Sequence, residues 1–180
     1  MDRYAQRMLT PRILWGALIT STFVYLYVLQ VAAPEDADPE PMMLPALGVA
    51  ALVAGVLSVF LPAYLHGRGA MAAELEVEEV PDPDASVMFR DQTPTVRRFA
   101  KPDAVVSKGM ALYMTPLILG MALGEAVAIF GFVLGVLGFE LPMILPFFVA
   151  SWVLMGLRFP RWSSVLGPLE RAQKARFVPD

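Results

Sequence analysis

The sequence predicts an all-α membrane protein that crosses the bilayer four times, as two helical hairpins with both ends in the cytoplasm. Three observations support this fold class. The apolar residues gather into four blocks, each block has about the length of a membrane span, and every basic residue falls on one side of a four-span arrangement. Hydrophobic residues make up 57% of the 180 residues, which is more than an ordinary soluble domain of this length contains.

Each apolar block is close to the roughly 20 residues that an α-helix needs to cross the hydrocarbon. The predicted spans are 13–33, 42–65, 110–138 and 141–158. In lipid the backbone must satisfy its own hydrogen bonds, which favours helices, and none of the blocks alternates as a barrel strand does. We expect the first span to be an uncleaved helix, because its apolar run exceeds the roughly 7–15 residues of a signal-peptide core.

The distribution of charge predicts the orientation of the spans. All fourteen lysines and arginines lie in the N-terminal arm, in the segment between the second and third spans, or in the C-terminal tail. The first connection, 34–41, carries only acidic charges, and the third connection carries Glu140. By the positive-inside rule both termini and the middle segment face the cytoplasm. We expect the membrane to be a bacterial inner membrane.

The chain therefore divides into four regions. They are a first hairpin at 1–66, a cytoplasmic loop of about forty residues at 67–108, a second hairpin at 109–158 and a basic cytoplasmic tail at 159–180. Prolines interrupt the loop, which predicts an irregular segment with at most one short β-hairpin. In the tail we expect a break at Gly167–Pro168, followed by a short basic helix on the membrane surface.

A basic cluster lies just before the third span. Its members are Arg97, Arg98, Lys101 and Lys108. We expect these residues to contact anionic lipid headgroups, at roughly 1 kcal/mol for each residue near the surface. Nucleic acid is not an expected partner, because acidic residues outnumber basic ones across 67–108 and no nucleic-acid-binding motif is present.

The third span contains one acidic side chain, Glu125, and no basic one. Glu125 is some 15 residues from the cytoplasmic end, hence roughly 22 Å deep and near the membrane midplane. A charged acid there costs roughly 2.5–3.5 kcal/mol. No lysine, arginine or histidine lies at that depth in the other spans, so burial favours the neutral form. We expect Glu125 to be protonated at neutral pH.

The hydroxyl groups at a matching depth are the candidate hydrogen-bond partners of Glu125. They are Ser21, Thr22 and Tyr25 on the first span, Ser58 on the second and Ser151 on the fourth. Of these, Ser151 and Thr22 are the first choices. Such a bond could serve only to join two helices, at about 0.6 kcal/mol. Alternatively, Glu125 could be a binding site for a proton or a cation, because acids inside the membrane are commonly functional.

Small residues recur every three to four positions along the third span. They are Gly120, Gly124, Ala128, Gly131, Gly135 and Gly138. A stripe of this kind predicts that another helix packs closely against it, from the same chain or from a second copy. The second span carries a similar stripe in Gly48, Ala51, Gly55 and Ser58.

The residues around the acid, Leu123 to Val133, read LGEAVAIFGFV. This stretch resembles the carboxylate helix of subunit c, the proteolipid of F-type and V-type ATP synthases. The resemblance covers about eleven residues of 180 and implies that Glu125 corresponds to the proton- or sodium-binding carboxylate of that family. In that family the glycine-rich helix precedes the carboxylate helix, whereas here the glycines lie on the acid-bearing helix itself.

We therefore expect a non-enzymatic membrane subunit in which Glu125 handles protons or cations within an assembly. The alternative is a purely structural or assembly subunit in which Glu125 is a neutral hydrogen-bonding group. The expected partners are the bilayer and either further copies of the chain or other membrane subunits. No cofactor or metal is expected: the chain has no cysteine, its one histidine, His66, has no second histidine to pair with, and no nucleophile–base pair can be assembled.

Overall fold

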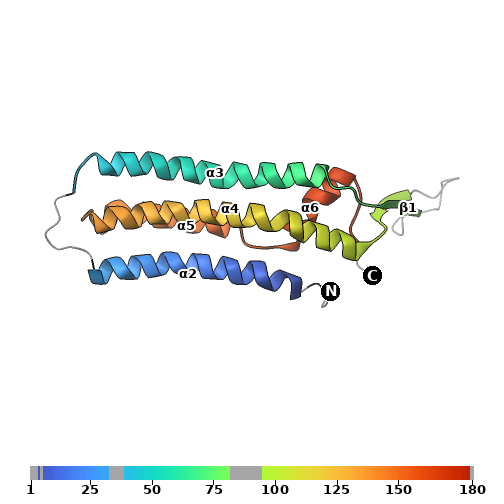
Figure 1. The fold of residues 1–180 in the computed structure, drawn as a ribbon, viewed down its shortest axis with the longest axis horizontal. Helices are drawn as coiled ribbons and strands as arrows, with labels where there is room; N and C mark the ends of the chain where they lie inside the picture. The colour runs from blue at the N-terminus through green and yellow to red at the C-terminus, as the bar shows by residue number, and fades with distance from the viewer. Residues whose placement is uncertain (1–3, 5, 33–38, 82–94, 179–180) are drawn as a thin grey trace, which may run out of the picture.

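The computed structural model describes residues 4, 6–32, 39–81 and 95–178, and it is mostly helical (Figure 1). The helices are a short 3-10 helix η1 (Gln6–Met8), then α2 (Leu9–Ala32), α3 (Met43–Met71), α4 (Pro102–Val136), α5 (Leu141–Gly156) and α6 (Trp162–Gln173). Two strands, β1 (Val77–Pro81) and β2 (Thr95–Phe99), form an antiparallel hairpin. The helices α2, α3 and α4 are long and apolar enough to cross a membrane, whereas α5 is equally apolar but shorter.

The helix that carries Glu125, α4, is the centre of the fold. It packs against α2, α3, α5 and α6, and α2 and α3 run on either side of the α4–α5 pair (Figure 1). Its 35 residues correspond to about 52 Å at 1.5 Å for each residue. The contacts on several sides explain why glycine and alanine are frequent on α4, since small residues let neighbouring helices approach closely.

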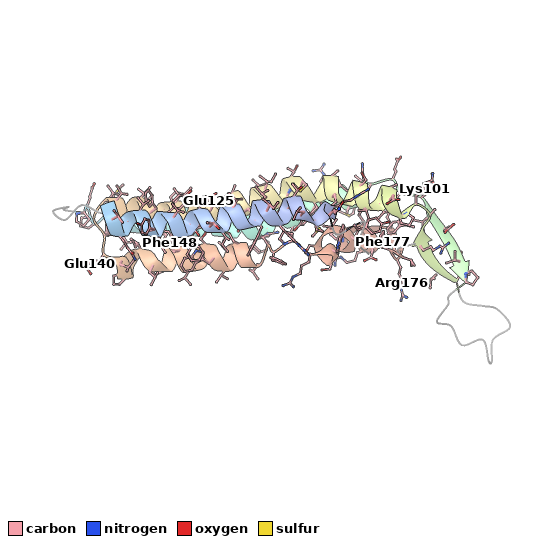
Figure 2. The ribbon with its side chains drawn as sticks, turned by 90° about the horizontal axis from the view of Figure 1, so that it is seen from below. Lys101, Glu125, Glu140, Phe148, Arg176 and Phe177 are labelled. Atoms are coloured by element: carbon pink, nitrogen blue, oxygen red, sulfur yellow. The ribbon has the colours of Figure 1, made fainter. Side chains whose placement is uncertain are left out.

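The two ends of the bundle differ in charge. The start of α2, the hairpin and α6 lie at one end, and the turn between α4 and α5 lies at the other (Figure 1). Figure 2 shows Lys101 and Arg176 at the hairpin end, Glu140 at the far end and Glu125 between them.

Each end of the bundle has its own buried core. Met8, Val106 and Leu169 belong to the core at the hairpin end, and Leu134 and Phe148 to the core near the turn.

A glycine ends α4 and forms the turn to α5. Gly138 has a φ of 92°, in the left-handed region that favours glycine. The N–H of Gly138 donates to the carbonyl of Gly135, and the N–H of Phe139 donates to that of Leu134. This is the Schellman pattern of a helix C-terminus. The prediction that Gly138 continues the packing stripe is therefore wrong, because the residue lies beyond the helix and is needed for its backbone conformation.

The segment between the second and third apolar blocks is more ordered than predicted. The helix α3 continues to Met71 and α4 begins at Pro102, so both helices enter the range 67–108. The hairpin places Glu78 opposite Arg98. The part of the predicted loop at 82–94 lies outside the described residues.

The helix in the C-terminal tail begins earlier than predicted, and its contact with a membrane surface stays a prediction. The helix α6 is continuous through Pro168, whereas a break at Gly167–Pro168 was expected. Val165, Leu166 and Leu169 are buried against the ends of α3 and α4. Burial of this apolar face offsets the single backbone hydrogen bond that Pro168 cannot make. After α6, the N–H of Arg176 donates to the carbonyl of Arg97 at 2.8 Å, which ties the tail to β2.

Candidate functional site

The carboxyl group of Glu125 lies between α4 and α2. Its Oε1 is 2.6 Å from the Ser21 Oγ and 2.9 Å from the Tyr25 hydroxyl oxygen. Ser21 and Tyr25 are four residues apart and therefore share one face of α2. The Ser21 Oγ also lies 2.6 Å from the backbone carbonyl of Leu18. The four groups form one continuous chain, from Leu18 through Ser21 and Glu125 to Tyr25.

Thr22 and Ser151, the two preferred partners from the sequence, do not contact Glu125. The Thr22 hydroxyl donates to the Ile19 carbonyl at 2.7 Å and accepts a hydrogen bond from the Trp152 Nε1 at 2.8 Å. Ser151 is fully buried next to the sulfur of Met155. Ser21 and Thr22 both lie at about the depth of Glu125, but the side chains of neighbouring residues on a helix point about 100° apart around its axis. Ser21 faces α4, and Thr22 consequently faces α5.

Ser58, the fifth candidate, is also remote from the carboxyl group. Its side chain is 1% exposed and its hydroxyl has no hydrogen-bond partner among the described residues. Its backbone carbonyl instead accepts a hydrogen bond from Arg158. Two of the five candidates, Ser21 and Tyr25, therefore meet Glu125, and both come from α2.

Among the residues that the structure describes, Glu125 forms no ion pair. The ion pairs that the described part of the chain forms, Arg98–Glu78 and Lys101–Glu76, both belong to the hairpin end. The Tyr25 ring packs on Phe132, with 5.4 Å between ring centroids. Glu125 is half-buried, and its second oxygen, Oε2, makes no hydrogen bond to any described residue. An acid in this setting has polar contacts on one side and an open face on the other.

Two further hydrogen bonds hold α2 against the bundle. The Trp15 Nε1 donates to the Met155 carbonyl at 2.9 Å, and the Trp152 Nε1 donates to Thr22. Glu125 is thus one of three polar connections between α2 and the α4–α5 pair, and these connections are spread along the length of α2.

The small residues of α4 are occupied by helices of the same chain. A Cβ at Gly131 would lie 2.7 Å from the Phe147 Cβ, and one at Gly135 would lie 2.7 Å from the Leu29 Cδ1. A Cβ at Gly124 would meet Met155 at 3.4 Å, and Ala128 is fully buried. The stripe faces α5 and α2 at these positions, and at Gly120 it faces Pro62 of α3 and Arg158, so it packs against elements of its own chain.

The small residues of α3 are arranged differently. A Cβ at Gly48 would have nothing within 4 Å, and one at Gly55 would touch only Leu154, at 3.5 Å. These glycines, with Ala51, line an apolar groove of about 430 Å³ between α3 and α5. This second stripe is only partly filled by the chain.

Arg158 is the last residue of the predicted fourth span, follows α5 in the structure, and had no predicted role. Its Nη2 donates to the backbone carbonyls of Ser58 and of Val59, the latter at 2.8 Å. Pro62 lies four residues after Ser58 and has no N–H, so the Ser58 carbonyl lacks its normal helical donor. Gly120 leaves room for this arrangement, since a Cβ there would lie 3.3 Å from the Arg158 Nε. The sequence signal for this contact was Pro62 inside an apolar block, because such a proline leaves the carbonyl four residues earlier without a donor from its own helix.

The basic cluster predicted to meet lipid headgroups is divided by the hairpin. The Arg98 Nε lies 2.6 Å from the Glu78 Oε1, and the Lys101 Nζ lies 2.9 Å from the Glu76 Oε2. Arg97 and Lys108 are exposed. Two of the four cations therefore have acidic partners, and contact of the cluster with lipid stays a prediction.

Comparison with known proteins identifies no relative of this chain. No family model matches the sequence, and no curated protein or solved structure matches it significantly. The likeness of residues 123–133 to the carboxylate helix of subunit c is therefore a local resemblance, and the functional argument depends on the geometry around Glu125.

Proposed function

We propose that the chain is a non-enzymatic integral membrane protein with four membrane-crossing helices, in which Glu125 is a neutral, hydrogen-bonded acid that joins α2 to α4. The observation that carries the proposal is the chain of short contacts from Leu18 to Tyr25. Its three oxygen–oxygen contacts measure 2.6, 2.6 and 2.9 Å. Each contact requires one hydrogen between its two oxygen atoms.

A count of hydrogens favours the protonated form of Glu125. Ser21 and Tyr25 each supply one hydroxyl hydrogen, and the Leu18 carbonyl supplies none. Three contacts therefore need one more hydrogen, which a protonated Glu125 provides. Glu125 then donates to Ser21, Ser21 donates to Leu18, and Tyr25 donates to Glu125. An ionised Glu125 could complete only two of the three contacts, and it would carry a charge with no ion-pair partner among the described residues.

Infrared spectroscopy of the full chain in lipid tests this protonation state. Wild-type protein at pH 7 is expected to show the carbonyl stretch of a protonated carboxyl group, and Glu125→Gln should remove that band. Glutamine keeps both a donor and an acceptor, so its free energy of unfolding should stay within about 0.5 kcal/mol of wild type. Glu125→Leu leaves Tyr25 without its partner and should cost about 1 kcal/mol. A wild-type spectrum that matches Glu125→Gln in the carboxylic acid region would refute the neutral form.

A second function, exchange of a proton at Glu125, is favoured by the open side of the site. The Oε2 has no described partner and Glu125 is half-buried, so a water molecule, an ion or a partner protein could approach it. The same infrared band separates the two functions. A band that persists as the pH is raised from neutral supports a fixed structural acid, whereas reversible loss of the band supports a site that exchanges protons and is part of a membrane assembly.

The arrangement of charge supports a topology with both termini in the cytoplasm. Described basic residues lie at the hairpin end, and Glu40 and Glu140 lie at the other. The chain has no cysteine, so single cysteines can report on each side separately. In sealed inside-out vesicles, Lys174→Cys should react with a membrane-impermeant maleimide, whereas Glu140→Cys should react only after the vesicles are opened. Equal labelling of both positions in sealed vesicles would overturn the four-span topology.

A further inference from the structure

A second polar site lies at the hairpin end of the bundle, well away from Glu125. It is a hollow of about 260 Å³ between α3, α4, the segment after α5 and the first turns of α6. Its polar lining consists of His66, Tyr113, Arg158, Ser163, Ser164 and Arg171, and no carboxylate lines it. The hollow therefore carries two positive charges and no negative one.

His66 shows that the hollow is prepared for a polar ligand. The side chain is 8% exposed and packs 5.7 Å from the Tyr113 ring, measured between centroids. Its Nε2 is buried and has no hydrogen-bond partner among the described residues. Nearly all buried polar groups in proteins have a partner, because leaving one unpaired is costly. His66 lines the hollow, and this nitrogen is a buried polar atom that the described residues leave unpaired.

The two arginines supply donors from different sides. Arg158 uses its Nη2 for the carbonyls of α3, and its Nη1 makes no hydrogen bond to a described residue. Arg171 is exposed on α6 and lines the same hollow. Guanidinium groups bind phosphate oxygens with paired hydrogen bonds, which makes arginine a common phosphate-binding residue.

The start of α6 adds further donors. Ser163 and Ser164 belong to its first turn, and no side chain caps this helix. The N–H groups of Ser164 and Val165 already donate to the Arg161 carbonyl. The N–H of Ser163 makes no hydrogen bond to a described residue, and the partial positive charge at a helix start favours anions. Polar groups of α3, of α6 and of the segment after α5 line the same hollow, and donors from three elements suit a tetrahedral phosphate better than a planar carboxylate.

We propose that this hollow binds a phosphate group, either on a phospholipid headgroup or as a free phosphate. The proposal is independent of the role of Glu125. The shared chemistry is a phosphate held by Arg158 and Arg171, with His66 and the start of α6 as further hydrogen-bonding groups.

Binding can be measured on the full chain purified in a neutral detergent. One arm follows the melting temperature with sodium phosphate against sodium chloride at equal ionic strength. The other arm uses native mass spectrometry to count retained phosphatidylglycerol against phosphatidylcholine. The test variant is Arg171→Gln, because Arg171 is exposed and its replacement should leave the fold intact. The matched control is Arg7→Gln, the same change at an exposed arginine of η1 that does not line the hollow.

We expect Arg171→Gln to weaken binding about tenfold, as loss of one hydrogen bond to a charged group implies. Arg7→Gln should change it by less than about twofold, as expected for an exposed charge outside the hollow. His66→Phe, which keeps a ring but removes the nitrogen, should also weaken binding. Retention of phosphatidylglycerol alone identifies a lipid headgroup, and stabilisation by phosphate alone identifies a free phosphate. Binding in neither arm, or equal loss in Arg171→Gln and Arg7→Gln, would overturn the proposal.

Discussion

Arg158→Leu is expected to lower the free energy of unfolding by about 3 kcal/mol. The variant removes the donor that binds the carbonyls of Ser58 and Val59. Pro62 cannot supply the helical N–H that Ser58 needs. A hydrogen bond to a charged group is worth about 1.5–3 kcal/mol, and an unpaired buried carbonyl adds its own desolvation cost. Equilibrium unfolding in mixed detergent micelles measures the difference.

A double-mutant cycle with Pro62→Ala identifies the cause. Alanine at position 62 restores an N–H four residues after Ser58, so the carbonyl regains a partner within its own helix. The loss caused by Arg158→Leu should therefore be smaller by at least about 1 kcal/mol in the Pro62→Ala background. If Arg158→Leu lowers the free energy of unfolding equally in both backgrounds, Arg158 does not stabilise the bundle by donating to the Ser58 carbonyl that Pro62 leaves without a helical donor.

Gly131→Ala is expected to cost about 2 kcal/mol, although alanine is the better helix former. The new Cβ would lie 2.7 Å from the Phe147 Cβ, 3.2 Å from the Phe148 ring and 3.3 Å from the Ile144 carbonyl oxygen. Two of these three neighbours are a backbone atom and a Cβ, which cannot move without shifting α5. Overpacking of this kind costs about 1–3 kcal/mol. The same unfolding measurement in micelles applies.

Two other glycines provide matched controls for this prediction. Gly48→Ala meets nothing within 4 Å and should be neutral or slightly stabilising. Gly135→Ala meets the methyl groups of Leu29, which are the flexible end of a side chain, so its cost should lie between the other two. A result in which Gly131→Ala and Gly48→Ala have equal stability would show that α4 and α5 are less closely packed than these distances indicate.

The bounds of the helices could be predicted from the sequence, because they depend on where each run of apolar residues begins and ends. The fourth block, predicted at 141–158, corresponds to α5 at Leu141–Gly156, and the first, predicted at 13–33, corresponds to α2 at Leu9–Ala32. The ends at the hairpin side were predicted less well. There α3 and α4 continue past their most apolar residues, because α6 and the N-terminal residues cover them with a core of their own.

Depth in the membrane limited the candidate partners of Glu125 to five hydroxyl groups, but it did not identify which of them form the hydrogen bonds. Ser21 and Thr22 lie at the same depth, and only the rotation of α2 about its axis decides which of them reaches α4. That rotation is set by tertiary contacts such as the hydrogen bonds of Trp15 and Trp152. Arg158 was missed for a similar reason, since its role depends on a carbonyl a hundred residues earlier in the chain.

In the proposed four-span topology, the unequal lengths of α4 and α5 have a consequence for the surrounding lipid. With 16 residues, α5 extends about 24 Å, which is less than the roughly 30 Å of an average hydrocarbon layer. Such hydrophobic mismatch is relieved by local thinning of the bilayer. Lipids with short acyl chains should therefore collect beside α5, and the protein should favour the thinner membranes of a cell over the thicker ones.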